Sequence, residues 1–217
     1  MRCAECRKWL GGTGRRLARD LEEHCPACEC EQHSVGDGSP GIVQNGETLY
    51  RMFVDPVDVD SDGRLARAAF SKAYEDGLSI LRERANDAEV EALAIDILST
   101  KPGKPTKKVL AIFRFVCVSV RQEMIVYNNA CVRAFCVYDQ TVPRIFEQGL
   151  APVPTHGIVL ARRMYVPPVT ARQFEHDCNV TLHRLIAAER IEVADFRDGL
   201  IHRLNERSAA GEFVRAA

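Results

Sequence analysis

The residues whose types and spacing point most directly to chemistry are cysteines near the N-terminus. Cys3 and Cys6 form one C-x2-C pair and Cys25 and Cys28 form a second, with residues 7–24 between them. Two such pairs direct four thiolates toward one tetrahedral ion. We therefore predict a structural zinc ion on these four cysteines. Because all four coordination positions are filled, the metal is expected to stabilise the fold and not to catalyse.

Other residues in the same segment could also serve as zinc ligands. Cys30, His24 and His33 each lie close enough in the sequence to replace one of the four cysteines. Redox chemistry of the cysteines, without any metal, is a further alternative. The segment resembles a four-cysteine zinc ribbon, a type of unit that binds nucleic acid, binds protein or caps another domain.

The number of cysteines and the N-terminal sequence bear on the cellular compartment. The chain has nine cysteines, and its N-terminus lacks the apolar stretch of a signal peptide. An odd number of cysteines without a secretion signal argues against a disulfide framework. No window approaches the roughly 18 consecutive apolar residues of a membrane span. We therefore expect a cytoplasmic protein that does not contact a membrane.

Charge is balanced, with 29 Lys plus Arg against 30 Asp plus Glu. A net charge of -1 and 46% hydrophobic residues indicate a globular protein and argue against one that coats nucleic acid wholesale. Local basic groups remain at Arg15, Arg16, Lys104, Lys107 and Lys108. We predict that these five residues contact the phosphates of a nucleic acid, the alternative being an ordinary solvated surface.

Three polar residues interrupt apolar surroundings in the central part of the chain. Arg51 lies within an apolar run, Ser71 follows Phe70, and His156 precedes a second apolar run. Because polar residues on or beside core strands often form sites, we predict that Arg51, Ser71 and His156 line one cleft. In the alternative interpretation Arg51 pairs with a nearby aspartate such as Asp58, and His156 is hydrogen-bonded in a loop.

The elements that must position these residues follow from periodicity. Residues 48–54 predict a strand that ends at Asp55-Pro56, and residues 109–120 predict a buried strand. Asn86 is a suitable N-cap for a helix over residues 87–98. Further strands are expected at 134–138 and 157–161, and helices at 170–186 and 193–204. This pattern indicates an α/β or α+β sheet domain closed by C-terminal helices.

Composition divides the chain into four parts. A zinc-binding unit is expected over residues 1–33, and a linker of small and turn-forming residues over 34–41. The sheet domain is expected to occupy residues 42–168 and the C-terminal helical segment 169–217.

The sheet domain carries three short motifs that resemble a known group. These are Leu49-Tyr50-Arg51, Phe70-Ser71 followed by a helix, and the strand that begins at Val109. With them the domain resembles the RES-type and ADP-ribosyltransferase-like domains of bacterial toxins, which handle NAD. The resemblance implies that Arg51 holds a diphosphate and that Ser71 lies beside the nicotinamide ribose. It also implies an acidic residue, for which the candidates are Glu75, Glu89, Glu91 and Glu123.

Two functions follow from these observations. The first is a zinc-containing cytoplasmic protein that recognises a nucleic acid or a protein partner. The second is an enzyme that processes NAD or another nucleotide, of the ADP-ribosyltransferase or NADase type, acting as a toxin or in defence. An enzyme is expected to consume its nucleotide in vitro, whereas a nucleic-acid-binding module is expected to show salt-dependent affinity for a polyanion.

Overall fold

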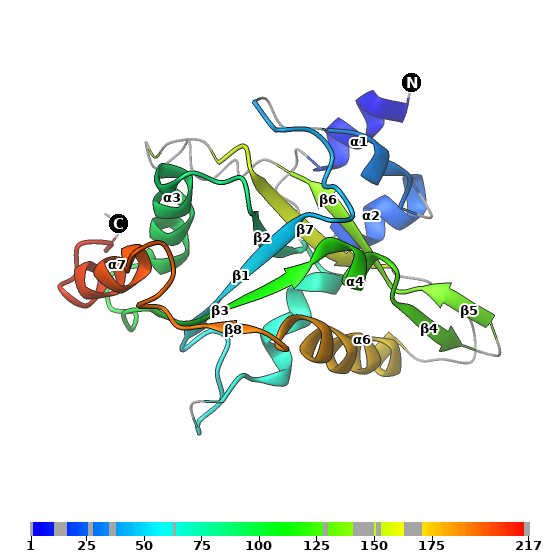
Figure 1. The fold of residues 1–217 in the computed structure, drawn as a ribbon. Coiled ribbons are helices and arrows are strands. Elements are labelled where there is room, and N and C mark those ends of the chain that lie inside the picture. Colours follow the sequence, from blue (N-terminus) through cyan, green and yellow to red (C-terminus); the bar gives the residue numbers. More distant parts are fainter. Residues whose placement is uncertain are drawn as a thin grey trace.

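The computed structural model describes residues 2–10, 17–25, 28–34, 38–62, 64–127, 130–140, 150, 153–162 and 171–214. Its strands are β1 (Thr48–Asp55), β2 (Leu78–Arg82), β3 (Lys108–Val116), β4 (Met124–Tyr127), β5 (Ala130–Arg133), β6 (Phe135–Asp139), β7 (His156–Ala161) and β8 (Arg190–Ile191). Six of them form one antiparallel sheet in the order β6-β7-β2-β1-β3-β8, while β4 and β5 form a separate hairpin (Figure 1).

The helices are α1 (Arg2–Leu10), α2 (Leu17–His24), α3 (Asp87–Leu98), α4 (Cys117–Arg121), α6 (Ala171–Ile186) and α7 (Leu200–Ala209), with 3-10 helices η1 (Glu29–Gln32) and η2 (Arg67–Tyr74). The predicted mixed α and β class with C-terminal helices is confirmed. Among the described helices, each is too short or too polar to cross a membrane.

Successive side chains of each strand point to opposite faces of the sheet, so that an apolar core forms on each side of it. On β1, Leu49 and Phe53 join a core that includes Phe174 and Leu182 of α6. Met52 joins a second core, to which α3 and α7 contribute. Figure 1 shows α3 and α7 side by side, away from α6. Because both faces are covered, the strands can carry the nearly continuous apolar runs seen in the sequence.

The start of α3 shows why this helix is well marked in the sequence. The Asn86 side chain accepts a hydrogen bond from the Glu89 backbone N–H, and the Glu89 carboxylate accepts one from the Asn86 N–H. This capping box satisfies two backbone donors that the first turn of a helix leaves without partners. The helix predicted over residues 87–98 is confirmed.

The N-terminal helices pack on the β6 end of the sheet. Cys6, Leu10 and Leu21 share a buried cluster with Tyr138 of β6 and Leu160 of β7. Figure 1 shows α1 and α2 beside these two strands. We call the segment formed by α1, α2 and η1, with Cys25 and Cys28, the cysteine unit.

Buried polar contacts hold the cysteine unit and the following segment to β6. The Glu31 carboxylate accepts a hydrogen bond from the backbone N–H of Val137 and pairs with Arg121 and Arg133. The hydroxyls of Ser34 and Ser39 donate to the two carboxylate oxygens of Asp139. The segment expected to be a linker therefore contacts the sheet at both of these serines.

The contact between β1 and β2 is short, and this feature positions the candidate site. β1 pairs with β3 along its whole length but with β2 only at Leu49↔Arg82 and Tyr50↔Leu81. Beyond Tyr50 the guanidinium of Arg51 donates to the backbone oxygen of Ser79. The Arg51 side chain thus provides the hydrogen bond that the Ser79 carbonyl does not receive from the backbone of β1.

Candidate functional site: a serine–histidine centre and a cysteine unit

Ser79 and His156 lie on the adjacent strands β2 and β7 and form a close hydrogen bond. Ser79 Oγ is 2.6 Å from His156 Nε2, and His156 Nδ1 is 3.0 Å from the backbone oxygen of Gln140. A carbonyl oxygen only accepts, so Nδ1 carries the ring proton. Nε2 of the neutral ring is therefore the acceptor, and the Ser79 hydroxyl donates to it. We call this arrangement, together with Arg51, the His156 centre.

Burial keeps His156 neutral. The side chain is buried, and desolvation lowers its pKa to about 4 against the opposing effects of the Gln140 hydrogen bond and the charges of Asp139 and Asp96. A ring with this pKa holds no proton on Nε2 at neutral pH. The Nε2 lone pair is therefore available to the Ser79 hydroxyl, while burial opposes the imidazolium charge that complete proton transfer would form.

Arg51 connects to the same pair from β1. Its Nη1 donates to the Ser79 backbone oxygen over 3.1 Å, and its Nη2 lies 3.8 Å from an oxygen of Asp58. Burial lowers the pKa of Arg51 and raises the pKa of Asp58, while the charge of each residue opposes the shift in the other. The aspartate partner considered for Arg51 from the sequence is thus present.

One buried polar atom of this centre has no hydrogen-bond partner among the described residues. It is Arg51 Nε. Buried donors without partners are rare, and each such case calls for a ligand, a water or an ion. A ligand with anionic oxygens would satisfy the Arg51 donor.

The structure brings together two of the three residues predicted to line a cleft. Arg51 and His156 both contact Ser79. Ser71 lies partly buried on η2 and, within the described chain, makes no hydrogen bond to either of them. Ser79 takes the place expected for Ser71. The sequence signal for it was the apolar run Leu78-Ser79-Ile80-Leu81 directly after the turn at Asp76-Gly77, which is typical of a strand.

The acidic residues expected from the family resemblance lie elsewhere. Glu89 caps α3, and the partners of the other three are Lys72 for Glu75, Arg207 for Glu91 and Arg184 for Glu123. The carboxylates whose charges act on His156 are instead those of Asp139 and Asp96. The centre therefore differs from the arrangement that the resemblance implies.

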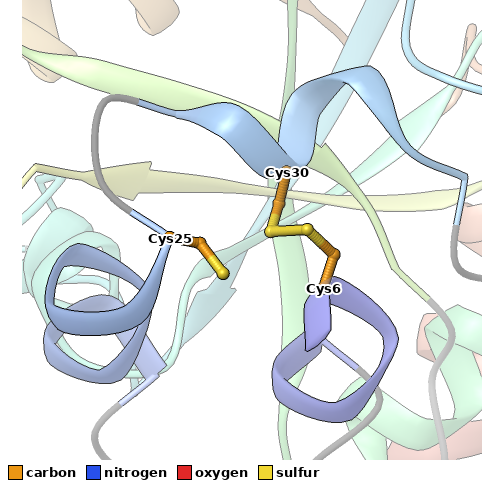
Figure 2. Close-up of side chains that lie close together, drawn as sticks. All are labelled: Cys6, Cys25 and Cys30. Carbon is orange, nitrogen blue, oxygen red and sulfur yellow. A yellow bond between two sulfur atoms is a disulfide. The ribbon is translucent and has the colours of Figure 1, made fainter. Parts of the chain in front are cut away.

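The cysteine unit contains two disulfides and a third buried cysteine. Cys6 is bonded to Cys30 and Cys28 to Cys136, each with a Cα–Cα distance of 5.4 Å. Cys25, at the end of α2, is buried and faces the Cys6–Cys30 bond (Figure 2). The sulfur atoms of Cys6, Cys25 and Cys30 all lie within 4.8 Å of one another, so in thiol form this group could hold a metal ion.

The predicted zinc ligands are only partly assembled by this arrangement. Cys6 and Cys25 come together, but with Cys30, which was an alternative ligand in the sequence. Cys28 lies instead with Cys136 and Glu31. Cys3 belongs to α1, and its side chain is outside the described part of the chain.

The expectation that the chain would lack disulfides is wrong for this structure. That expectation rested on the number of cysteines and on the N-terminus. The pairing instead follows from the fold, because docking η1 on β6 brings Cys28 to Cys136 across 108 residues of sequence. At this Cα separation two cysteines can bond without a backbone shift.

Of the three described residues that were predicted to contact phosphates, two are engaged within the chain. Lys107 Nζ donates to the backbone oxygens of Ile97 and Ser99 at the end of α3, and Lys108 lies 3.6 Å from Asp55. Lys104 is exposed in a loop. Arg15 and Arg16 lie outside the described residues.

No protein-family model, curated protein or solved structure matches this chain.

Proposed function

We propose that this chain is an enzyme that processes NAD or another nucleotide at the His156 centre. The observation that carries the proposal is the 2.6 Å contact between Ser79 Oγ and the unprotonated Nε2 of buried His156. A hydroxyl paired with a neutral imidazole, itself oriented by a third group, is an arrangement used for nucleophilic and general-base chemistry. Here the orienting group is the Gln140 backbone oxygen.

Each residue of the centre has a distinct role in this proposal. His156 accepts the hydroxyl proton as Ser79 Oγ forms a bond to the anomeric carbon of the ribose, and the bond from that carbon to the base breaks, so that the base leaves with the bonding electrons. Arg51 Nε is a buried donor without a partner in the described chain, and it suits an oxygen of a diphosphate. Arg51 is also the residue to which the family resemblance assigns the diphosphate.

The experiment compares two serine variants of the purified chain. NAD, ATP and other nucleotides are incubated separately with the protein, and their loss is followed by chromatography. Ser79→Ala is expected to lower the rate at which the protein consumes its nucleotide by about 10²-fold to 10⁴-fold. This is the usual contribution of one general acid–base interaction.

Ser71→Ala is the matched control, because Ser71 is also partly buried but lies on η2 and, within the described chain, makes no hydrogen bond to His156. It is expected to retain most of the activity. Equal rates for Ser79→Ala and the unmodified chain would refute the proposed role of Ser79, and the absence of nucleotide loss from the unmodified chain would refute the function.

Recognition of a nucleic acid or a protein partner stays a prediction from the sequence. The contacts favour it less, because Lys107 and Lys108 are already engaged within the chain. Affinity for an oligonucleotide that falls steeply with salt would support it.

We also propose that the metal suited to the cysteine unit is zinc. In thiolate form Cys6, Cys25 and Cys30 offer the soft sulfur donors that zinc prefers, with Cys3 as the expected fourth ligand. Such an ion would cross-link α1, α2 and η1, which is a structural role.

Elemental analysis of protein purified under reducing conditions is expected to find one zinc per chain, and Cys25→Ser is expected to lose it. Cys131→Ser is the matched control, since Cys131 is exposed on β5 and outside the unit. Zinc retained by Cys25→Ser would exclude this ligand set.

A further inference from the structure

One residue contacts both the cysteine unit and the His156 centre. The side-chain Nε2 of Gln140 donates to the backbone oxygen of Leu10 over 3.0 Å, and the backbone oxygen of Gln140 accepts the Nδ1–H of His156. Leu10 is the last residue of α1, the helix that carries Cys6. Gln140 is buried, so neither hydrogen bond is readily exchanged for one to water.

The strand that precedes Gln140 contacts the same unit at several points. Cys136 is bonded to Cys28 and the Val137 N–H donates to Glu31, while Asp139 accepts from Ser34 of the segment that follows the unit. A displacement of the cysteine unit is therefore expected to reach Gln140 both through α1 and along β6.

The sulfur chemistry of the unit gives it two forms. In one, Cys6 and Cys30 are thiols able to bind a metal together with Cys25; in the other, they are joined as a disulfide. A peroxide converts the thiol form into the disulfide form, since two thiols and one hydrogen peroxide give one disulfide and two waters; a dithiol reductant, which is itself oxidised to a disulfide, reverses the change. The two cysteines lose two electrons and two protons, and the O–O bond of the peroxide is broken.

The two forms differ in geometry as well as in charge. Disulfide sulfurs are bonded at about 2 Å, whereas two thiolates on one tetrahedral zinc stand roughly 3.8 Å apart. A change of that size between α1 and η1, roughly 1.8 Å, exceeds the spread of about 0.5 Å over which hydrogen-bond distances vary. On the side of α1, the hydrogen bond between Gln140 and Leu10 is one contact that such a change is expected to alter.

We propose that the cysteine unit regulates the His156 centre, with Gln140 as the positioning residue that transmits the oxidation state of Cys6 and Cys30 to the imidazole. The regulatory part of this inference rests on the proposed function. The structural part, a coupling between the sulfur chemistry and the environment of His156, stands on the contacts described above.

The first measurement does not need activity. Protein labelled with ¹⁵N in its histidines is prepared in two states, reduced with zinc and treated with hydrogen peroxide. The Nδ1 resonance of His156, identified by its loss in His156→Gln, is expected to differ between the states. In Gln140→Met, which keeps the side-chain length but removes the donor to Leu10, that difference is expected to shrink or vanish.

Two cysteine variants keep the test decisive if Gln140→Met fails to fold. Cys30→Ser cannot form the bond to Cys6, so peroxide is expected to leave its His156 resonance in place. Cys131→Ser, which alters an exposed cysteine outside the unit, is expected to respond as the unmodified chain does. An unchanged resonance in the unmodified chain, with oxidation verified by thiol counting, would overturn the coupling, and so would a full response in Cys30→Ser.

The second measurement separates this inference from the proposed function. Peroxide treatment is expected to change the rate of nucleotide consumption by about 10-fold to 100-fold, as expected for a misplacement near 1 Å at a catalytic group. Consumption at equal rates in both states would overturn the regulation and leave the proposed function standing. A moving His156 resonance with no consumption in either state would overturn the proposed function and leave the coupling standing.

Discussion

The His156 centre and the cysteine unit are held together by different means. The centre draws Arg51, Ser79 and His156 from β1, β2 and β7, three strands of one sheet whose register fixes their relative positions. In the cysteine unit one sulfur bond joins α1 to η1, while a second sulfur bond and the buried carboxylate of Glu31 hold the unit to β6 and Arg133. Backbone pairing does not depend on oxidation state, whereas sulfur bonds do. The two regions are therefore expected to respond differently to reductant, pH and mutation.

The largest effect is expected at Arg82, which contributes to both regions. It is fully buried on β2 and pairs with Glu47 and with Asp139, the residue that binds Ser34. Arg82→Ala leaves two buried carboxylates without their cation and is expected to cost about 3 to 5 kcal/mol of unfolding free energy, measured in urea. Arg84→Ala, at an exposed turn position, is the control. A loss below about 1 kcal/mol would mean that water reaches both carboxylates.

Cys28→Ser is expected to separate the two regions. Without reductant it removes a bond that spans 108 residues and is expected to cost about 2 to 4 kcal/mol, the usual range for a native disulfide. With reductant the variant and the unmodified chain are expected to unfold at the same urea concentration. If the variant still unfolds at a lower urea concentration than the unmodified chain after reduction, Cys28 contributes to stability as a thiol. That result would support the predicted zinc ligand set that includes Cys28.

The pH dependence is expected to report on the His156 centre. The pKa of His156 is lowered to about 4 in the folded chain, against 6.5 for an unperturbed histidine. Between these values the unfolded chain binds a proton that the folded chain does not, so stability is fully present above about pH 6.5 and falls as the pH drops toward about 4.

The expected loss from this residue is about 2 to 3 kcal/mol. Urea unfolding at a series of pH values, compared with His156→Gln, measures it. Parallel curves for the two proteins would show that His156 takes up its proton in the folded chain as readily as in the unfolded one.

The smallest effect is expected at a position that belongs to neither region. Asn86→Ala removes the cap of α3 and is expected to cost about 1 kcal/mol. Zinc content, thiol reactivity and the His156 resonance are expected to stay unchanged. A change in any of them would show that the two regions are coupled through the helical layer and not only through Gln140.

Local patterns in the sequence were sufficient for several elements. Asn86 and the apolar spacing after it predicted α3, and the run that ends at Asp55-Pro56 predicted β1. The strand predicted over residues 109–120 is shorter, because β3 ends at Val116 and α4 follows. An apolar run buried on all sides has the same composition in a strand and in a short helix, so its internal boundary could not be predicted.

The candidate site was less predictable because it depends on contacts between distant residues. Ser79 and His156 are 77 residues apart, and their contact depends on β2, an element of five residues that the sequence analysis did not predict. The pairing of Cys28 with Cys136 likewise requires the docking of η1 on β6. Spacing along the chain indicated sulfur chemistry near the N-terminus but not which cysteines meet.

The contact between Glu31 and Val137 has a consequence for the solubility of shortened chains. β6 is the last strand on its side of the sheet, and such a strand offers free backbone groups to any other extended chain. Here the Glu31 carboxylate takes the N–H of Val137 and Arg121 takes its carbonyl oxygen. The N-terminal segment therefore blocks strand-to-strand association between copies, and a fragment that starts after η1 would present an open template for aggregation.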